Sequence, residues 1–164
     1  MIPSDHFVRY YNEVFKTLAA MGHEHMEAYW RELGRLQAQE LAEAFRAGGI
    51  QATYDYWQKI LEEENCLGEL TLTEDYFEFK MNRCPSLGKV LDNDAAPCHQ
   101  YCDHCMGWIE PTMDAAGLHV AHDIHSRTEP HCVLRVYADE AKMRDWEATA
   151  LLPCRPYDDP PAKA

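Results

Sequence analysis

The stretch "YFEFKMNRCP" (residues 76–85) decides the fold class of this 164-residue chain. Its apolar and polar residues alternate, so that Phe77, Phe79 and Met81 share one side of an extended segment. A period of two predicts a half-buried strand. The strand ends at the Cys-Pro pair, because proline lacks the N–H that would continue a ladder and favours a turn or a helix start.

The same alternation recurs on both sides of this strand. "ELTLT" (69–73) precedes it, and "LHVAHDIHS" (118–126) and "CVLRVY" (132–137) follow it further along the chain. The polar turn "RTEP" (127–130) joins the last two stretches. The sequence therefore predicts four strands in two pairs.

The first part of the chain has a helical period instead. Apolar residues recur three and four apart over residues 6–21, then between Gly22 and Gly48-Gly49, and again over residues 51–64. The order of helices, strands, a cysteine-bearing segment and further strands predicts an α+β fold. We expect a helical N-terminal half packed on an antiparallel sheet, with a cysteine-bearing helix between the strand pairs.

Length and composition predict one domain over residues 1–155. Its helical part would cover residues 1–65, and its sheet and cysteine helix residues 66–138. Residues 156–164 are rich in proline and charge and are expected to form a flexible tail.

The balance of 28 acidic against 15 basic residues gives a formal net charge of −13. An acidic chain without a basic stripe argues against nucleic acid and against anionic membranes as partners. We see no signal peptide and no apolar run of the roughly 20 residues that a membrane span needs, so a cytoplasmic location is expected. The sequence is compatible with a homo-oligomer.

The chain holds seven cysteines. Without a secretion signal, such thiols are expected to be ligands, nucleophiles or small buried residues rather than disulfides. In "PCHQYCDHCMGW" (97–108), Cys98, Cys102 and Cys105 have the spacing i, i+4 and i+7 and would share one face of a helix. The two histidines of this stretch would point away from that face.

Three interpretations of these cysteines remain open. Their spacing matches the cluster loop of radical S-adenosylmethionine enzymes, but only 59 residues follow Cys105, too few for the βα units those enzymes need. A zinc or iron ion is a second interpretation, with Cys84, Cys132 or a nearby histidine completing the ligands. The third is that the cysteines are small core residues.

The histidine-rich strand adds polar candidates. His119, Asp123 and His125 share one face of "LHVAHDIHS". Such a face could hold a metal ion or supply a general base. The alternative is a solvated strand face, which we prefer for His119, whereas Asp123 and His125 lie deeper in the alternating run.

Three short motifs carry a resemblance to a known family. "NRCP" (82–85), "HQYCDHC" (99–105) with a proline soon after it, and "EPHCVLRVY" (129–137) resemble the signature blocks of the L-2-amino-thiazoline-4-carboxylic acid hydrolase family. The matched motifs lie within residues 76–137. The helical first half is similar to that family only in its pattern.

The resemblance implies roles for Cys84, Cys102 and Cys132. The chain departs from the family at Cys105, where an aspartate is usual, and at the Pro-His pair that replaces a glycine–acid pair before the last cysteine. Both changes add residues that can bind metal. The same block order is similar to 4-vinyl reductase-type small-molecule-binding domains, in which cysteines hold a structural zinc, and this likeness implies a non-enzymatic role.

Taken together, these features predict a hydrolase-like enzyme acting on a small cyclic or amide substrate that contains nitrogen or sulfur. A metal would polarise water or substrate, and His125, assisted by Asp123, would move protons. Without a metal, Cys98 or Cys102 near the helix start would be the nucleophile, and Cys102 is the predicted catalytic cysteine. The predicted metal ligands are Cys84, Cys98, Cys102, Cys105 and Cys132. The alternatives are a zinc-stapled sensor module for small molecules and an iron–sulfur protein with a three-cysteine cluster.

Overall fold

A computed structural model describes residues 3–63, 66–92 and 96–157 of the chain. In chain order the elements are α1 (Pro3–Met21), α2 (His23–Glu63), β1 (Leu67–Leu72), β2 (Tyr76–Arg83), α3 (Pro85–Asp92), α4 (Asp103–Ala116), β3 (His119–Asp123), β4 (Cys132–Tyr137) and α5 (Glu140–Glu147). The predicted α+β fold is confirmed, with two helices between the strand pairs.

The four strands form one antiparallel sheet in the order β1-β2-β4-β3. In its register Phe79 of β2 lies opposite Leu134 of β4, which in turn lies opposite His122 of β3. All three side chains are buried. The alternation predicted for β2 is therefore confirmed, and the same face of the sheet carries a buried histidine.

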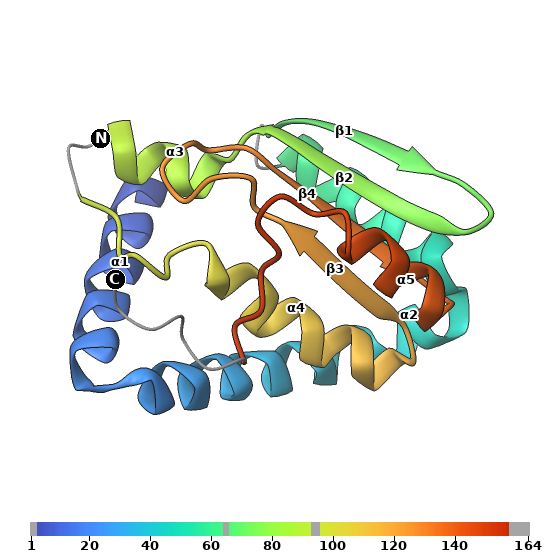
Figure 1. Cartoon of the computed structure of the whole chain (residues 1–164), viewed down its shortest axis with the longest axis horizontal. Helices are drawn as coiled ribbons and strands as arrows, with labels where there is room; N and C mark the ends of the chain where they lie inside the picture. Colours follow the sequence, from blue (N-terminus) through green and yellow to red (C-terminus); the bar gives the residue numbers. More distant parts are fainter. Residues whose placement is uncertain (1–2, 64–65, 93–95, 158–164) are drawn as a thin grey trace.

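Helices α2 and α4 cover this apolar face, and α5 contacts β3 and β4 (Figure 1). The larger of two core clusters joins Trp57 of α2, Ile109 of α4 and Val136 of β4. Helix α1 lies at the far end of the molecule from β1 (Figure 1). A second core cluster there contains Phe15 of α1 and Tyr101, which lies in the turn before α4.

Helices α2 and α4 approach each other closely through two glycines. A Cβ added at Gly107 would come within 2.6 Å of Trp30 Cγ, and one added at Gly34 within 2.7 Å of Pro111 Cγ. Contacts this short are excluded sterically, so both positions need a residue without a side chain. The N-terminal half of α4 is therefore seated directly on α2.

Pro111 lies inside α4 without ending it. A proline removes the N–H that would bond to the carbonyl four residues earlier, here that of Gly107. The hydroxyl of Tyr157 donates to this carbonyl instead. Tyr157 also lies 4.1 Å below the guanidinium of Arg31. The described start of the predicted tail is thus packed, and residues 158–164 lie outside the described residues.

The predicted break at the glycine pair is confirmed, because Gly49 has a non-helical φ of 59° and α2 consists of two helices that meet there at a kink. Two other features differ from those predicted. Helix α4 begins at Asp103, so Cys98 precedes it. Helix α5 was not expected, because it has no buried residue and hence no apolar stripe to reveal it. Asp139 caps it by accepting backbone hydrogen bonds.

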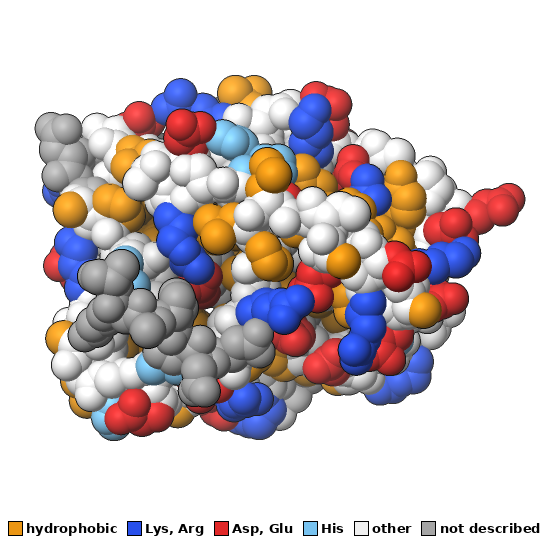
Figure 2. All heavy atoms as spheres, in the orientation of Figure 1, with side chains coloured by type: hydrophobic (Ala, Val, Ile, Leu, Met, Phe, Trp, Pro, Cys, Tyr) orange, Lys and Arg blue, Asp and Glu red, His pale blue; other side chains and the backbone are white. Residues whose placement is uncertain are grey.

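On the face shown in Figure 2, Lys and Arg side chains are scattered among Asp and Glu rather than gathered in one stripe. No helix in the described ranges has both the length and the apolar character needed to cross a membrane.

Candidate functional site

The loop before α4 is fixed by one buried residue of α1. Asn12 accepts a hydrogen bond from the backbone N–H of Cys98 at 2.8 Å and donates one to the carbonyl of Ala96 at 3.0 Å. Asn12 is fully buried, so these bonds exchange little with water. They hold Cys98 against α1, away from the other cysteines.

Four of the five cysteines predicted as metal ligands meet around one small cavity. Cys84 precedes α3, Cys102 and Cys105 lie at the start of α4, and Cys132 opens β4. The cavity measures about 20 Å³, room for a single water-sized species. We call it the thiol cavity, lined by Cys84, Cys102, Cys105 and Cys132 together with His104, His122 and His131.

Two helix N-termini face the thiol cavity. Cys84 stands just before Pro85, the first residue of α3, and its Sγ accepts a hydrogen bond from the backbone N–H of Leu87 at 3.4 Å. Cys102 is the N-cap residue of α4, and its side chain makes no capping bond. The partial positive charge of a helix start favours a negatively charged sulfur.

Burial acts in the opposite direction on the four thiols. It raises the pKa of Cys84 to about 11 and the pKa values of Cys102 and Cys105 to about 12. Burial also raises the pKa of Cys132 well above its ordinary value, and repulsion from the other three thiols adds to it. All four are therefore protonated at neutral pH unless a cation balances their charge.

His122 contributes an unsatisfied polar atom to the cavity wall. Its exposed fraction is 3%, and its Nδ1 has no hydrogen-bond partner among the described residues. Burial lowers the pKa of His122 to about 4, so the ring is neutral. A buried polar atom without a partner costs about 1–3 kcal/mol, which indicates a position that awaits a partner.

His104 has a defined tautomer. Its Nδ1 lies within hydrogen-bond distance of the Tyr101 carbonyl, which can only accept, so Nδ1 carries the hydrogen. Burial lowers the pKa of His104, and the neutral ring leaves Nε2 as an acceptor 3.6 Å from Cys105 Sγ. The ring packs against Phe15, with 5.4 Å between ring centroids.

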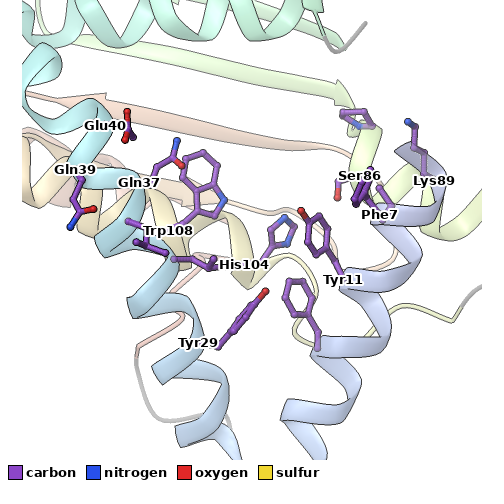
Figure 3. A pocket seen from close by; sticks show the side chains of 15 residues that line it. Phe7, Tyr11, Tyr29, Gln37, Gln39, Glu40, Ser86, Lys89, His104 and Trp108 are labelled. Atoms are coloured by element: carbon purple, nitrogen blue, oxygen red, sulfur yellow. The ribbon is translucent and has the colours of Figure 1, made fainter. Parts of the chain in front are cut away.

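A larger cavity lies on the other side of His104. It measures about 740 Å³, within the range of small-molecule sites. We call it the aromatic cavity, because its walls include Phe7, Tyr11, Phe15, Tyr29, His104 and Trp108. In Figure 3 His104 lies between Tyr11 and Trp108. His104 lines both cavities and forms the wall between them.

The predicted catalytic pair lies beside the thiol cavity but not in its wall, since the His125 ring is 5.5 Å from the ring of His131, a lining residue. His125 Nε2 lies 3.3 Å from Asp123 Oδ2, but neither residue is among those that line the two cavities. The Asp123 carboxylate accepts backbone N–H bonds from His125, Leu151 and Leu152 at 2.8–3.0 Å. Burial alone would raise the pKa of Asp123, but the Leu151 and Leu152 donors outweigh it and the pKa is lowered.

The structure thus unites Cys84, Cys102, Cys105 and Cys132, and leaves Cys98 outside. Sequence reasoning missed His104 and His122. The alternation of β3 already placed His122 on the core face with Val120, so its signal was present. For His104 the sequence held no such signal, because on a regular helix that includes Cys98 its side chain would point away from the face that carries the cysteines.

The donor set of the thiol cavity fits a soft metal ion such as zinc or iron, since thiolates at a Cys-x2-Cys spacing are their usual ligands. The unsatisfied Nδ1 of His122 and the two helix starts support the fit. In the part of the chain that the structure describes, no three His, Cys, Asp or Glu side chains are yet placed to hold an ion as they stand. Binding would require these side chains to move closer together.

Comparison with known proteins gives no relative for this site. No protein-family model, no curated protein and no solved structure matches the chain. The resemblance to the thiazoline carboxylate hydrolases stays a prediction that rests on three short motifs.

Proposed function

We propose that this chain binds a small, flat, largely apolar molecule in the aromatic cavity, next to a metal ion held by Cys84, Cys102, Cys105 and Cys132. One observation carries the proposal: the His104 ring is a wall of both cavities. A small-molecule site and a group of four thiols are therefore separated by one side chain.

The donor set supports the metal. Burial keeps the four thiols protonated in the absence of an ion, and a divalent cation would offset part of the charge of the thiolates that bind it. Zinc or iron bound there would supply a cross-link among the starts of α3, α4 and β4. A site with four protein thiolates is closed, and closed sites are structural, so we favour the binding module over the hydrolase.

The walls of the aromatic cavity support a flat apolar ligand. Aromatic side chains from α1, α2 and α4 form part of its wall, and aromatic rings bind planar molecules by stacking and edge contacts. Polar groups stand at its margins, Ser86 and Lys89 on α3 and Gln37 and Glu40 on α2 (Figure 3). A ligand with hydrogen-bonding groups at two edges would fit this distribution.

Hydrolysis of a small nitrogen- or sulfur-containing ring or amide is the second candidate. The observation that favours it is the 3.6 Å approach of His104 Nε2 to Cys105 Sγ, a base beside a thiol. The base would take the thiol proton, the sulfur would attack the carbonyl carbon, and the C–N bond would break as the same proton passes to the leaving nitrogen. Water would then hydrolyse the thioester and return the free thiol. Neither Cys105 nor the predicted catalytic residues Cys102, Asp123 and His125 line the aromatic cavity, so turnover would require the substrate to reach Cys105 past the His104 ring.

Metal content tests the first part of the proposal. We would measure zinc and iron per chain after anaerobic purification, in the wild type, in Cys105→Ala and in Cys98→Ala. About one equivalent is expected in the wild type and in Cys98→Ala, and none in Cys105→Ala. A metal-free wild type would overturn the metal site. Visible absorption with acid-labile sulfide would instead indicate the iron–sulfur cluster.

A fluorescent apolar probe, N-phenyl-1-naphthylamine, tests the second part. Leu36 lines the aromatic cavity and is 45% exposed, whereas Leu151 is 79% exposed and lines neither cavity. Leu36→Lys should weaken probe binding at least ten-fold, because it introduces a charge into an apolar wall, and Leu151→Lys should not. Equal binding by both variants would contradict the cavity assignment. Release of product from a thiazoline or cyclic amide would establish the hydrolase.

A further inference from the structure

The segments that carry the thiols also build the inner wall of the aromatic cavity. Cys84 faces the thiol cavity, while Ser86, two residues later, lines the aromatic cavity. Cys105 faces the thiol cavity, while the adjacent His104 lines both. An ion that fixes the two sulfurs would also restrict the neighbouring residues that a ligand touches.

Hydrogen bonds join these two segments to each other. Ser86 Oγ and Tyr101 Oη lie 2.7 Å apart, and the Tyr101 carbonyl accepts the Nδ1–H of His104. Tyr101 is buried, so these bonds are shielded from water. The start of α3 and the start of α4 are therefore joined through Tyr101 in one hydrogen-bonded unit.

His104 lies at the centre of this unit. Its Nε2 faces Cys105 Sγ, and the opposite side of its ring packs on Phe15 of α1, which also lines the aromatic cavity. His131, by contrast, lines the thiol cavity and not the aromatic cavity. His131 is therefore a matched control for His104, because it lines one of the two cavities and His104 lines both.

We infer that metal binding in the thiol cavity and ligand binding in the aromatic cavity are positively coupled through His104. The inference rests on the proposed function. A bound ion orders the starts of α3 and α4, so the ligand meets a preformed wall and loses less conformational entropy on binding. Linkage makes the effect reciprocal, so the ligand strengthens metal binding by the same factor. His104 is a positioning residue in this scheme.

The test titrates N-phenyl-1-naphthylamine into chelator-treated wild-type protein, with and without one equivalent of Zn²⁺. We expect probe affinity to rise about ten-fold with zinc, a typical size for coupling between two sites. The reciprocal measurement follows zinc transfer to a chromophoric chelator, which saturating probe should slow. This second measurement uses only wild-type protein.

Two variants assign the coupling to a residue. In His104→Ala the ratio of probe affinities with and without zinc should fall towards one, while zinc and probe each still bind. In His131→Ala the ratio should stay near the wild-type value, even if zinc affinity itself changes. A general loss of structure would lower the probe affinity both with and without zinc and would leave the ratio of the two unchanged. Rescue of the ratio in His104→Gln, which keeps a side-chain donor near the Tyr101 carbonyl, would support the positioning role.

The outcomes separate this inference from the proposed function. If zinc and probe both bind and neither alters the other, the coupling is wrong and the two sites remain. If the coupling persists in His104→Ala, His104 is not its route. If the wild type binds no zinc or no probe, the proposed function itself fails, and the coupling fails with it.

Discussion

Two buried polar regions lie near the end of β3: the thiol cavity, and the Asp123 cluster, which consists of Asp123, His125 and the backbone of Leu151 and Leu152. They differ in whether their polar atoms have hydrogen-bond partners. Asp123 accepts three backbone N–H bonds and lies against His125. In the thiol cavity, His122 Nδ1 has no partner among the described residues, and burial raises the pKa values of all four thiols. Satisfied polar groups stabilise the fold, whereas an unsatisfied group beside the four thiols is consistent with a site for an ion or ligand.

The Asp123 cluster accordingly attaches the segment after α5 to the edge of the sheet. Besides the carboxylate bonds, the backbone N–H of Ile124 bonds to the Leu152 carbonyl at 3.1 Å, and that of Cys154 to the His122 carbonyl at 2.8 Å. This segment covers the outer edge of β3, which would otherwise expose unpaired backbone groups. We therefore interpret Asp123 as an anchor, and its catalytic role stays a prediction.

The largest expected effect is on metal-dependent stability. Zinc at about 100 times its Kd should raise the free energy of unfolding of the wild type by about 2.7 kcal/mol. Cys132→Ala should abolish this gain, because it removes a ligand, and Cys66→Ala should retain it, because buried Cys66 lies outside the thiol cavity. Chemical denaturation with zinc and with EDTA measures both gains. A zinc gain that survives in Cys132→Ala would remove this residue from the site.

Next in size is the loss of the Asp123 anchor. Asp123→Asn replaces an acceptor by an amide whose NH₂ group would oppose a backbone N–H, so the free energy of unfolding should fall by about 2 kcal/mol. Zinc content should not change, since the carboxylate lies outside the thiol cavity. Urea denaturation measures the loss of stability, and elemental analysis measures the zinc content. An Asn variant of normal stability that lacks metal would reverse our assignment of anchor and site.

The same anchor predicts a pH dependence. The folded-state pKa of Asp123 is lowered, so its stabilisation is fully present above the unfolded pKa of about 3.9 and is lost as pH falls through the folded value. The stability difference between wild type and Asp123→Asn should be constant from about pH 7 to 5 and should shrink below about pH 4. Denaturation curves at three pH values test this. If the stability difference between the two proteins already shrinks above pH 5, a titrating group other than Asp123 is responsible.

The smallest effect concerns His122. His122→Leu removes the unsatisfied Nδ1 and fills the space with an apolar side chain. The free energy of unfolding of the metal-free variant should therefore equal that of the metal-free wild type or exceed it by up to about 1 kcal/mol. Denaturation in EDTA is the measurement, with His119→Leu on the half-buried outer face as the control. A loss of more than about 1 kcal/mol in His122→Leu alone would mean that this nitrogen is satisfied in solution.

The sequence predicts the fold well where the pattern is local. The alternation of β2 and the helical period before it follow from side-chain geometry, which needs no distant partner. The start of α4 could not be predicted in this way, because the N–H of Cys98 is held by Asn12, 86 residues earlier in the chain. A helix drawn from Cys98 put three cysteines on one face and excluded His104.

The same distinction between local pattern and distant contacts applies to the candidate site. Cys84 and Cys132 could be proposed as partners of the α4 cysteines because each borders a predicted strand, and paired strands bring such ends together. The satisfied state of Asp123 depends on the backbone of Leu151 and Leu152, which no motif reveals. Residue type identified the candidates, and only their surroundings separated anchor from site.

The hydroxyl of Tyr157 has a practical consequence for protein engineering. Because it caps the carbonyl that Pro111 leaves open in α4, the chain is part of the domain at least as far as this residue. A shortened version that stopped at Arg155 would expose an unpaired carbonyl beside the Gly107–Trp30 contact. Affinity tags and fusion partners are therefore better joined after residue 157 than at the end of α5.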